Sequence, residues 1–454
     1  MVKLKEKNKE AYTRSLLEAL HGENILLFRK YFLDLHPTDQ VACFISLNAE
    51  MRQRVYQYLS PAEFSEIFRG LELEEQKALI TELDHSFAVE MFNQMFADDV
   101  ADFFGELSES NAQSFLKKMT KAEAEDVKDL LKYPEETAGG IMTTEFIAVS
   151  DTDTVAEVMN LLRREGPEAE TIYYLYVVDE HGKLVGVLSL RDLIISPADK
   201  QIKEIMSRRV VSVMTMDDQE DVAKVIQNYD FLAVPVVTNH GTLVGIVTVD
   251  DVLDVLEEEV TEDFEELSAA RGSAALDLSS FDAARRRAPW LIVLLFLGLM
   301  TASLIGLFED TLENVAVLAL FIPLIAGAAG NTGTQSLAVV VRSIALGNLE
   351  KGGMIRLLRR EFGTGILLGL VCGIVLSMLI ALFYDANMIL GFIVGFSLFC
   401  VLSIATVVGA LIPLIIHKLN IDPAVASGPF ITTINDIIGL MIYFSIASLL
   451  LQYL

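Results

Sequence analysis

The pattern of apolar and polar positions changes twice along the chain, near residue 134 and near residue 285. Before residue 134, apolar residues recur every three or four positions, which predicts successive short helices. Residues 134–253 alternate strand-like and helix-like segments. Beyond residue 285 the apolar positions form runs long enough to span a bilayer, which takes about 20 residues. Five such runs cover residues 290–308, 315–341, 362–384, 388–416 and 425–454.

Residues 1–133 contain an imperfect repeat. The segment "LHPTDQVACFISL" from Leu35 resembles "MFADDVADFFGEL" from Met95. Repeated helical hairpins of this kind predict a small all-α superhelix. Asp98, Asp99 and Asp102 share one side of a helix start. They either complement the helix dipole or form a cation site.

The next 120 residues or so contain a clearer duplication. "LYVVDEHGKLVGVLSLRDL" at 175–193 matches "VPVVTNHGTLVGIVTVDDV" at 234–252. Each copy predicts strand, helix, strand, turn, strand and helix, with Gly182 and Gly241 in the turns. This α/β pattern resembles a tandem pair of cystathionine-β-synthase-type (CBS) modules, at residues 134–200 and 201–253.

The resemblance to CBS pairs implies an adenine-nucleotide cleft between the modules, with ATP as a regulatory ligand. Tyr174 and Phe231 precede the paired strands, where an aromatic ring could stack on a base. Arg191 and Asp192 follow a strand where a phosphate or ribose contact could form. The alternative is that the two aromatic residues belong to the core and that Arg191 and Asp192 form a local ion pair.

Residues 250–284 are predicted to form one helix that leads to the first span, with residues 254–284 as the connector. Its apolar residues form a single stripe, whereas its other faces carry the acidic run "EEEVTEDFEE". Like charges at i and i+4 repel one another. Mg²⁺ prefers oxygen ligands and keeps waters while using one or two carboxylates. We therefore hypothesise that Mg²⁺ relieves the charge repulsion along the connector and so acts as a switch. The carboxylates concerned are Asp250, Asp251, Asp254, Glu257, Glu258 and Glu259.

Charge divides the chain in the same place as hydropathy. Of its 35 basic residues, 26 precede residue 285, and of its 63 acidic residues, 55 do. This surface disfavours nucleic acid as a partner. The connections after the second and fourth spans are basic, as are residues 285–287, whereas the intervening turns are acidic or neutral. The positive-inside rule then predicts an inner or plasma membrane protein with cytoplasmic N-terminal domains and an external C-terminus.

The second span is unusually polar. "IPLIAGAAGNTGTQSLAVVVR" combines proline and glycines with Asn331, Thr334 and other polar residues, which favours a pore-lining role over helix packing alone. In the fifth span Asp436 is a lone carboxylate. It either faces an aqueous cavity or is a buried group that is protonated or bonded to Thr432, Thr433 or Asn435.

The order of acidic helical domain, CBS pair, acidic connector and five spans resembles the MgtE-type magnesium channels. "GNTGTQS" and "DPAVASGPFITTINDIIGLMIYF" resemble two signature segments of that family. The resemblance implies a homodimer with a pore at its interface, where Asp436 coordinates hydrated Mg²⁺. The pore positions that match are Gly330, Asn331, Thr334, Asp422 and Asp436. Thr334 and Gly428 depart from the family pattern, which often has asparagine at both places.

The resemblance also implies that cytosolic carboxylates sense Mg²⁺ and close the pore. The matching residues are Asp98, Asp99, Asp102, Asp218, Glu220, Asp230, Asp251, Asp254, Glu259, Glu262 and Asp263. The expected fold is thus multidomain: an all-α superhelical N-domain, an α/β tandem CBS pair, a connector helix and an all-α transmembrane domain (285–454).

The function that these features favour is a Mg²⁺-selective, Mg²⁺-gated uptake channel. The chain contains no ATPase motif and no nucleophile–base constellation, so no enzymatic activity is expected. Two alternatives remain open at this point. One is a secondary divalent-cation transporter coupled to H⁺ or Na⁺, and the other is a nucleotide-responsive membrane scaffold without transport.

Overall fold

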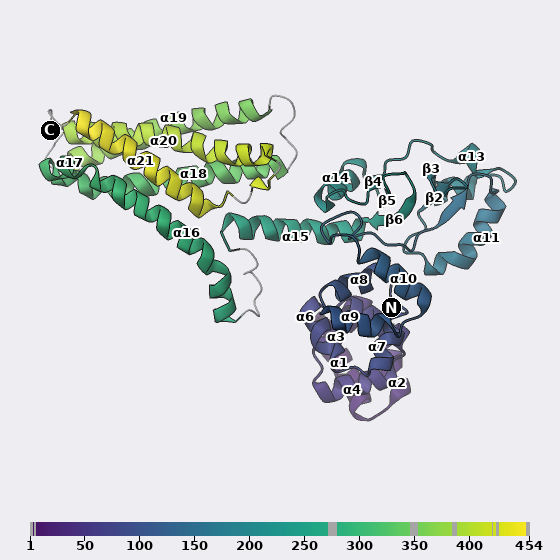
Figure 1. Ribbon diagram of the computed structural model, residues 1–454. Helices are drawn as coiled ribbons and strands as arrows, with labels where there is room; N and C mark the ends of the chain where they lie inside the picture. The colour runs from purple at the N-terminus through teal and green to yellow at the C-terminus, as the bar shows by residue number, and fades with distance from the viewer. Residues whose placement is uncertain are drawn as a thin grey trace. The chain divides into compact units, whose positions relative to one another are not determined.

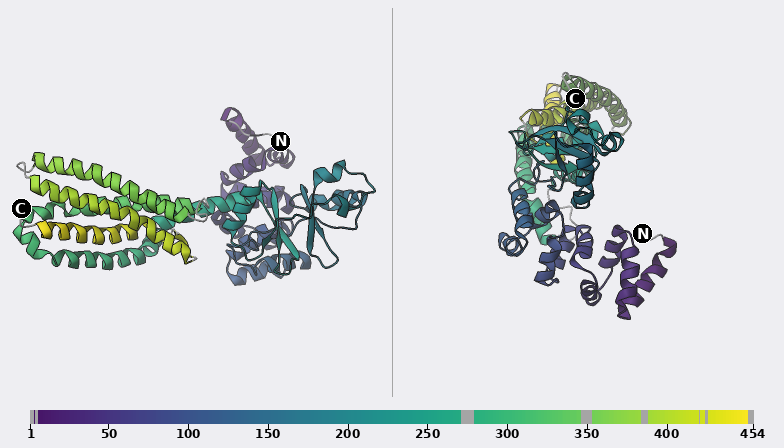
Figure 2. Two further views of the ribbon diagram at one scale, coloured as in Figure 1. Left: turned by 90° about the horizontal axis from the view of Figure 1, so that it is seen from above. Right: turned by 90° about the vertical axis from the view of Figure 1, so that its right-hand side faces the viewer.

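The computed structural model describes residue 3 and residues 6–270, 279–345, 353–383, 388–419, 421–423 and 426–450. The chain divides into two compact units, Met1–Leu256 and Glu257–Leu454. Short helices and two small sheets make up the first unit, and a bundle of long helices makes up most of the second (Figure 1). Figure 2 shows the two small sheets and the long helices from two further directions.

The first part of the first unit is entirely helical in its described residues, as predicted. Asn24, Asn48 and Ser60 each accept a hydrogen bond from a backbone N–H in the first turn of the following helix. Buried aromatic rings fill the interior, and Phe68 and Phe92 meet edge to face at 5.7 Å. The helices are α1 (Glu6–His21), α2 (Ile25–Asp34), α3 (Pro37–Ile45), α4 (Ala49–Tyr58), α5 (Pro61–Arg69), α6 (Leu73–Ile80), α7 (His85–Phe92), α8 (Ala97–Gly105), α9 (Glu109–Leu116) and α10 (Lys121–Leu130).

Two α/β modules follow, and each has the predicted order of elements. In each sheet the first strand pairs parallel to the second, and the second pairs antiparallel to the third. Gly182 and Gly241 occupy the tight turns with φ of 75° and 81°, where glycine is favoured. The elements are β1 (Ala148–Ser150), α11 (Val155–Glu165), β2 (Tyr174–Val178), β3 (Leu184–Ser189) and α12 (Leu190–Ile195), then α13 (Ile202–Ile205), β4 (Val213–Met214), α14 (Gln219–Tyr229), β5 (Ala233–Val237) and β6 (Leu243–Thr248).

The connector helix is shorter than predicted. Helix α15 (Val249–Leu267) ends where its apolar stripe ends, and Ala269 adopts a left-handed φ of 55°. The Ser268 hydroxyl donates back to the carbonyl of Phe264 at 2.8 Å, which satisfies part of the helix end. Residues 271–278 of the predicted connector lie outside the described residues, and Ser280 already belongs to the next helix. The prediction of one continuous helix over 250–284 was therefore wrong.

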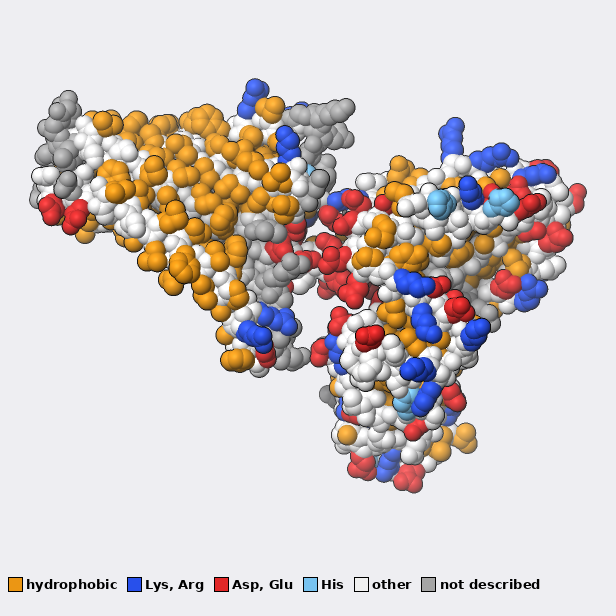
Figure 3. Space-filling model, in the orientation of Figure 1, with side chains coloured by type: hydrophobic (Ala, Val, Ile, Leu, Met, Phe, Trp, Pro, Cys, Tyr) orange, Lys and Arg blue, Asp and Glu red, His pale blue; other side chains and the backbone are white. Residues whose placement is uncertain are grey.

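The second unit confirms the five predicted spans. Within the described residues, five helices have the length and hydropathy to cross a membrane. Apolar side chains cover most of the visible face of this bundle (Figure 3). The elements are α16 (Ser280–Gly306), α17 (Glu309–Asn314), a 3-10 helix (Ala316–Phe321) continuous with α18 (Ile322–Ala345), α19 (Gly353–Phe383), α20 (Met388–Lys418) and α21 (Gly428–Leu450).

Glycines allow the membrane helices to approach closely. Helix α20 packs against α18, α19 and α21. On α19, a side chain at Gly369 would meet the carbonyl oxygen of Phe399 at 2.7 Å, and one at Gly373 would meet that of Gly395 at 2.6 Å. At the crossing of α18 and α20, a side chain at Gly409 would collide with the carbonyl oxygen of Gly333. In lipid the hydrophobic effect does not drive helices together, so the close van der Waals packing that small residues allow stabilises these crossings instead.

Glu63 is predicted to stabilise the helical domain in a pH-dependent manner. Burial opposes its charge, but hydrogen bonds from Arg29 (2.6 and 2.8 Å) and Ser60 hold its pKa below the usual range. Glu63→Gln should lower the free energy of unfolding of residues 1–256 by about 1–2 kcal/mol at pH 7. Because the folded pKa is lowered, the difference from wild type should disappear as the pH falls through that pKa. Urea unfolding at several pH values measures both effects.

Glu50→Gln is the matched control, because Glu50 is exposed and pairs with Arg54 only at 3.3 Å. Its effect should stay within about 0.5 kcal/mol. An equal loss in both variants would contradict the role assigned to Glu63.

Gly409→Ala should destabilise the membrane bundle. The added methyl meets backbone rather than a flexible side chain, and overpacking of this kind costs about 1–3 kcal/mol. The control is Gly363→Ala on α19, where nothing lies within 4 Å of the new Cβ. Thermal denaturation of the detergent-solubilised full chain, followed by size exclusion, should show a lower midpoint for Gly409→Ala alone. A wild-type midpoint for that variant would refute the close crossing.

Candidate functional site

Helices α18 and α21 lie side by side and bring most of the predicted pore residues together. A side chain at Gly330 would lie 2.5 Å from Thr432 Cγ2 and 3.4 Å from Asp436 Oδ1, so only glycine leaves room for α21 here. Four residues later, Thr334 Oγ1 lies 3.2 Å from Thr432 Oγ1. The two signature segments therefore meet along one helix pair.

Among the described residues, one oxygen of Asp436 lacks the hydrogen bond that a structural carboxylate would need. It is half-buried, and its Oδ1 has no hydrogen-bond partner among the described residues. The neighbouring Thr433 hydroxyl donates instead to the carbonyl of Pro429 at 2.9 Å. Asn435 is buried away from Asp436, with no hydrogen bond to either side-chain atom within the described part of the chain. The described residues thus leave the buried Oδ1 of Asp436 without a hydrogen bond from protein.

The polar face of α18 is uncovered in this single chain. Asn331 and Gln335 are exposed, and Gly327 lies one turn before them on the same side. Exposed amides at membrane depth are costly next to lipid, so this face requires water or protein. Asp422 is exposed just before α21 begins. Carboxylate, amide and hydroxyl groups on this face are suited to hydrogen-bond the waters of a hydrated cation.

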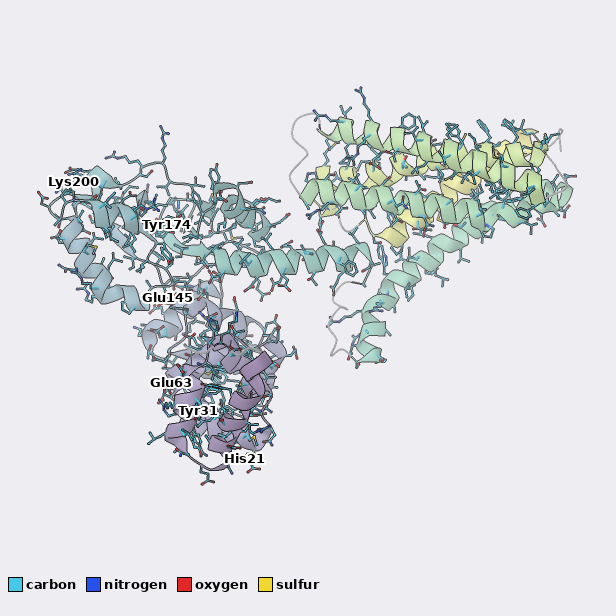
Figure 4. All side chains as sticks on the ribbon, turned by 180° about the vertical axis from the view of Figure 1, so that it is seen from behind. His21, Tyr31, Glu63, Glu145, Tyr174 and Lys200 are labelled. Carbon is cyan, nitrogen blue, oxygen red and sulfur yellow. The ribbon has the colours of Figure 1, made fainter. Side chains whose placement is uncertain are left out.

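A second group of carboxylates lies in the first unit, where α8 meets the α/β modules. Asp98 and Asp99 occupy the first turn of α8, and Asp99 lies 3.9 Å from Arg69. Glu145, labelled in Figure 4, accepts a hydrogen bond from the backbone N–H of Ala97 at 3.0 Å. Asp251 accepts from the Thr248 hydroxyl at 2.5 Å. Asp98 Oδ1 is buried without a hydrogen-bond partner among the described residues.

Burial and mutual repulsion favour the protonated forms of this group. Burial, followed by the charges of Asp99 and Asp251, raises the pKa of Asp98 well above its usual value. Burial also raises the pKa of Asp99 to about 6, although Arg69 opposes the shift, and it raises the pKa of Asp251. Glu170 belongs to the same group, and burial raises its pKa to about 7. An added cation would relieve the repulsion.

The remaining predicted sensor residues are more dispersed. Asp218 caps α14, Glu220 lies 3.1 Å from Lys224, and Asp230 ends α14 in a left-handed conformation. Asp102 and Asp254 are exposed. Glu259, Glu262 and Asp263 lie farther along α15. Within the described ranges, no group of three or more His, Cys, Asp or Glu side chains has the geometry of a metal site.

The predicted nucleotide residues do not form one cluster. Tyr174 starts β2 and packs beside buried Tyr176, whose hydroxyl has no hydrogen-bond partner in the described part of the chain. Phe231 stacks on Tyr229 at 5.4 Å. Arg191 is exposed, and Asp192 accepts from Ser189 Oγ at 2.6 Å. Phe231 also packs against the main buried cluster of the first unit, which favours the core interpretation for this residue.

Three residues of these sites were missed in the sequence. Glu145 and Glu170 join the acidic group through folding of segments far apart in the chain, so no local pattern marks them. Glu361 is 5% exposed on α19 and accepts a hydrogen bond from Ser336 on α18 at 2.9 Å. The sequence alone could have marked Glu361, because a carboxylate between an arginine pair and an apolar run is unusual.

Comparison with known families covers most of the chain. Residues 322–446 match the family described as a divalent cation transporter, and residues 35–136 match the MgtE intracellular N domain. CBS domains match residues 138–198 and 202–258.

Curated relatives match over nearly their whole length. The magnesium transporter MgtE of Enterococcus faecalis is 43% identical over 440 residues, covering 96% of this chain and 97% of the relative. The proteins of the same name from Bacillus subtilis and Thermus thermophilus are 41% and 40% identical, covering 93% and 96% of this chain and 93% and 98% of the relatives.

Two solved structures resemble the first unit. The soluble part of a magnesium transporter is 44% identical with a TM-score of 0.54, covering 55% of this chain and 98% of that one. The cytosolic domain of the Mg²⁺ channel MgtE in complex with ATP is 41% identical with a TM-score of 0.51. The match covers 54% of this chain and 99% of that one. The chain belongs to the MgtE family, a family of magnesium transporters rather than enzymes.

Proposed function

We propose that this protein is a Mg²⁺-selective channel whose pore is formed where two copies of α18 and α21 face each other. The observation that carries this proposal is Asp436, a half-buried carboxylate in a membrane span with no hydrogen-bond partner at Oδ1 among the described residues. A hydrated divalent cation is the partner with the right charge, and two facing carboxylates would match it.

The uncovered polar face of α18 supports a homodimer. Asn331 and Gln335 are exposed in one chain, where lipid would be an unfavourable neighbour. A second copy related by twofold symmetry would place the same face opposite and enclose water between them. The cation would then pass Asn331 and Asp436 and meet Asp422 near the basic, cytosolic side, with the C-terminus outside.

Asp436→Ala should strongly reduce Mg²⁺ influx into proteoliposomes that contain the purified full chain. We expect at least an approximately tenfold loss, equivalent to about 1.4 kcal/mol, because the carboxylate supplies the attraction that replaces bulk solvation. The control is Asp282→Asn, an exposed carboxylate at the start of α16. An internal Mg²⁺-sensitive dye reports the flux.

The same assay separates the alternatives. Flux that requires a proton or sodium gradient would favour a coupled transporter with Asp436 as the proton carrier. Wild-type flux in Asp436→Ala would refute the pore assignment, and absence of flux in the wild type would favour a scaffold without transport.

The acidic group around α8 is the proposed Mg²⁺ sensor. Asp98, Asp99 and Asp251 repel one another across the junction between the helical domain and the modules, so a cation that bridges them would draw these parts together. Mg²⁺ needs only one or two carboxylates because it retains waters. The proposed auxiliary ligands are Asp102 on α8, Asp218, Glu220 and Asp230 at α14, and Asp254, Glu259, Glu262 and Asp263 on α15. Binding would favour the closed pore.

Neutralising the sensor should reduce the response to Mg²⁺. In the full chain, limited proteolysis of the first unit should slow when Mg²⁺ is raised to about 10 mM, in the range of weak carboxylate sites. Asp98→Asn combined with Asp251→Asn should bring the ratio of cleavage rates without and with Mg²⁺ close to one. Glu180→Gln, in an exposed turn, is the control. A full Mg²⁺ response in the double variant would exclude these residues as the sensor.

ATP is a proposed regulatory ligand of the CBS pair. The support is a relative whose cytosolic domain was solved with ATP, together with Tyr174 beside the buried hydroxyl of Tyr176, which has no hydrogen-bond partner among the residues that the structure describes. Arg191, which is exposed, and Asp192 would serve the phosphate and ribose. Phe231 would contribute only if it left its stacking contact with Tyr229. Nucleotide binding would tune the sensor rather than drive transport.

A further inference from the structure

Glu361 is a second carboxylate in the membrane helices, and its surroundings differ from those of Asp436. Glu361 lies on α19 and is 5% exposed. Its Oε2 accepts a hydrogen bond from Ser336 Oγ at 2.9 Å, and its Oε1 accepts from Arg360 Nη2 at 3.1 Å. Both oxygens are thus occupied, and the Arg360 side chain, 58% exposed, keeps its charge near solvent. A buried carboxylate is tolerated when it is paired in this way.

The Ser336 hydroxyl behaves unlike the neighbouring hydroxyl groups. Thr332, Thr334 and Ser343 each donate to the carbonyl four residues earlier on their own helix, at 2.8, 2.9 and 2.7 Å. This local bond is the usual one for serine and threonine in membrane helices. Ser336 instead reaches a different helix, α19, and is itself only 2% exposed. The contact therefore links α18 to α19.

The contact lies opposite the pore side of α18. Two residues along a helix correspond to a rotation of about 200° and a rise of about 3 Å. Ser336 and Thr334 consequently lie on opposite faces at nearly the same height. Thr334 approaches Thr432 on α21 at 3.2 Å, while Ser336 donates to Glu361 on α19. Helix α18 is held from both sides at the residues that follow Asn331.

We infer that Glu361 and Ser336 are positioning residues that set the rotation of the pore helix α18 and thereby its ion selectivity. This inference rests on the proposed pore. Asn331 is three residues from Thr334 and lies on the same side of the helix, about 60° away. A rotation of about 15° would move a side-chain tip at a radius of about 5 Å by more than 1 Å. Shifts of that size alter the spacing of groups around a hydrated ion.

The test uses the full chain in proteoliposomes and compares Mg²⁺ flux with Ca²⁺ flux. Ser336→Ala removes the donor but leaves the ion pair of Glu361 with Arg360, and Glu361→Gln keeps an acceptor of the same shape. The matched control is Ser397→Ala, because Ser397 is also fully buried but donates to Ile393 on its own helix. Thermal midpoints in detergent are measured for every variant.

Ser336→Ala should lower the Mg²⁺/Ca²⁺ flux ratio about three- to tenfold, the range expected for one hydrogen bond. Glu361→Gln should lower it less, because the amide oxygen can still accept from Ser336, and the double variant should be no worse than Ser336→Ala, because both act through one contact. Ser397→Ala should keep the wild-type ratio. A purely structural contact would lower the thermal midpoint and total flux without changing the ratio.

The outcomes distinguish the inference from the proposed function. If wild type conducts Mg²⁺ and Asp436→Ala does not, but Ser336→Ala has the wild-type ratio, the positioning role is wrong and the pore stands. If wild type carries no Mg²⁺, the proposed function itself fails. Should Glu361→Gln not fold, Ser336→Ala decides the question, because it retains the buried ion pair.

Discussion

A carboxylate at membrane depth needs a partner, because an unpaired charge there costs about 2.5–3.5 kcal/mol on insertion scales. The membrane unit meets this constraint in two ways. Glu361 has both oxygens occupied, by Ser336 and Arg360. Asp436 has an oxygen without a hydrogen-bond partner among the described residues, beside the exposed amides of α18. The first arrangement links α18 to α19, whereas the second leaves a buried carboxylate oxygen without a hydrogen bond from the described residues, which is the basis of the proposed pore role.

The same electrostatic principle governs the first unit, although its solvent is water. Carboxylates at the start of α8 are drawn close to those of the modules, and burial makes their repulsion expensive. Glu145 holds the start of α8 through the N–H of Ala97, so the group stays assembled despite its charge. Repulsion that folding maintains can be released by a ligand, which is the physical basis for a cation-operated switch. One element, α8, thus contributes both the attachment and the charged residues.

The sequence predicted what periodicity and duplication encode. The five spans, the helical domain and the two copies with glycine turns at 182 and 241 were all recovered, because each is a repeated or long-range pattern in hydropathy. The end of α15 was misjudged: the acidic run and the apolar stripe both stop by Leu267, but the alanines that follow at 269 and 270 favour a helix and did not mark the end. Asp436 was found because a lone charge in an apolar run is visible locally. Glu145, Glu170 and the Ser336–Glu361 contact depend on segments brought together only by folding.

The two departures from the family pattern prove to be neighbours in space. A side chain added at Gly428 would lie 3.3 Å from Thr334 Cγ2, closer than ordinary van der Waals contact. Thr334 is β-branched, so its methyl has little freedom to move away on a helix. Its hydroxyl is also committed to Gly330 and Thr432. Asparagine at 428 would therefore compete with threonine at 334 for the same space. The structure thus couples the two positions, because glycine at the start of α21 leaves room for the branched residue on α18.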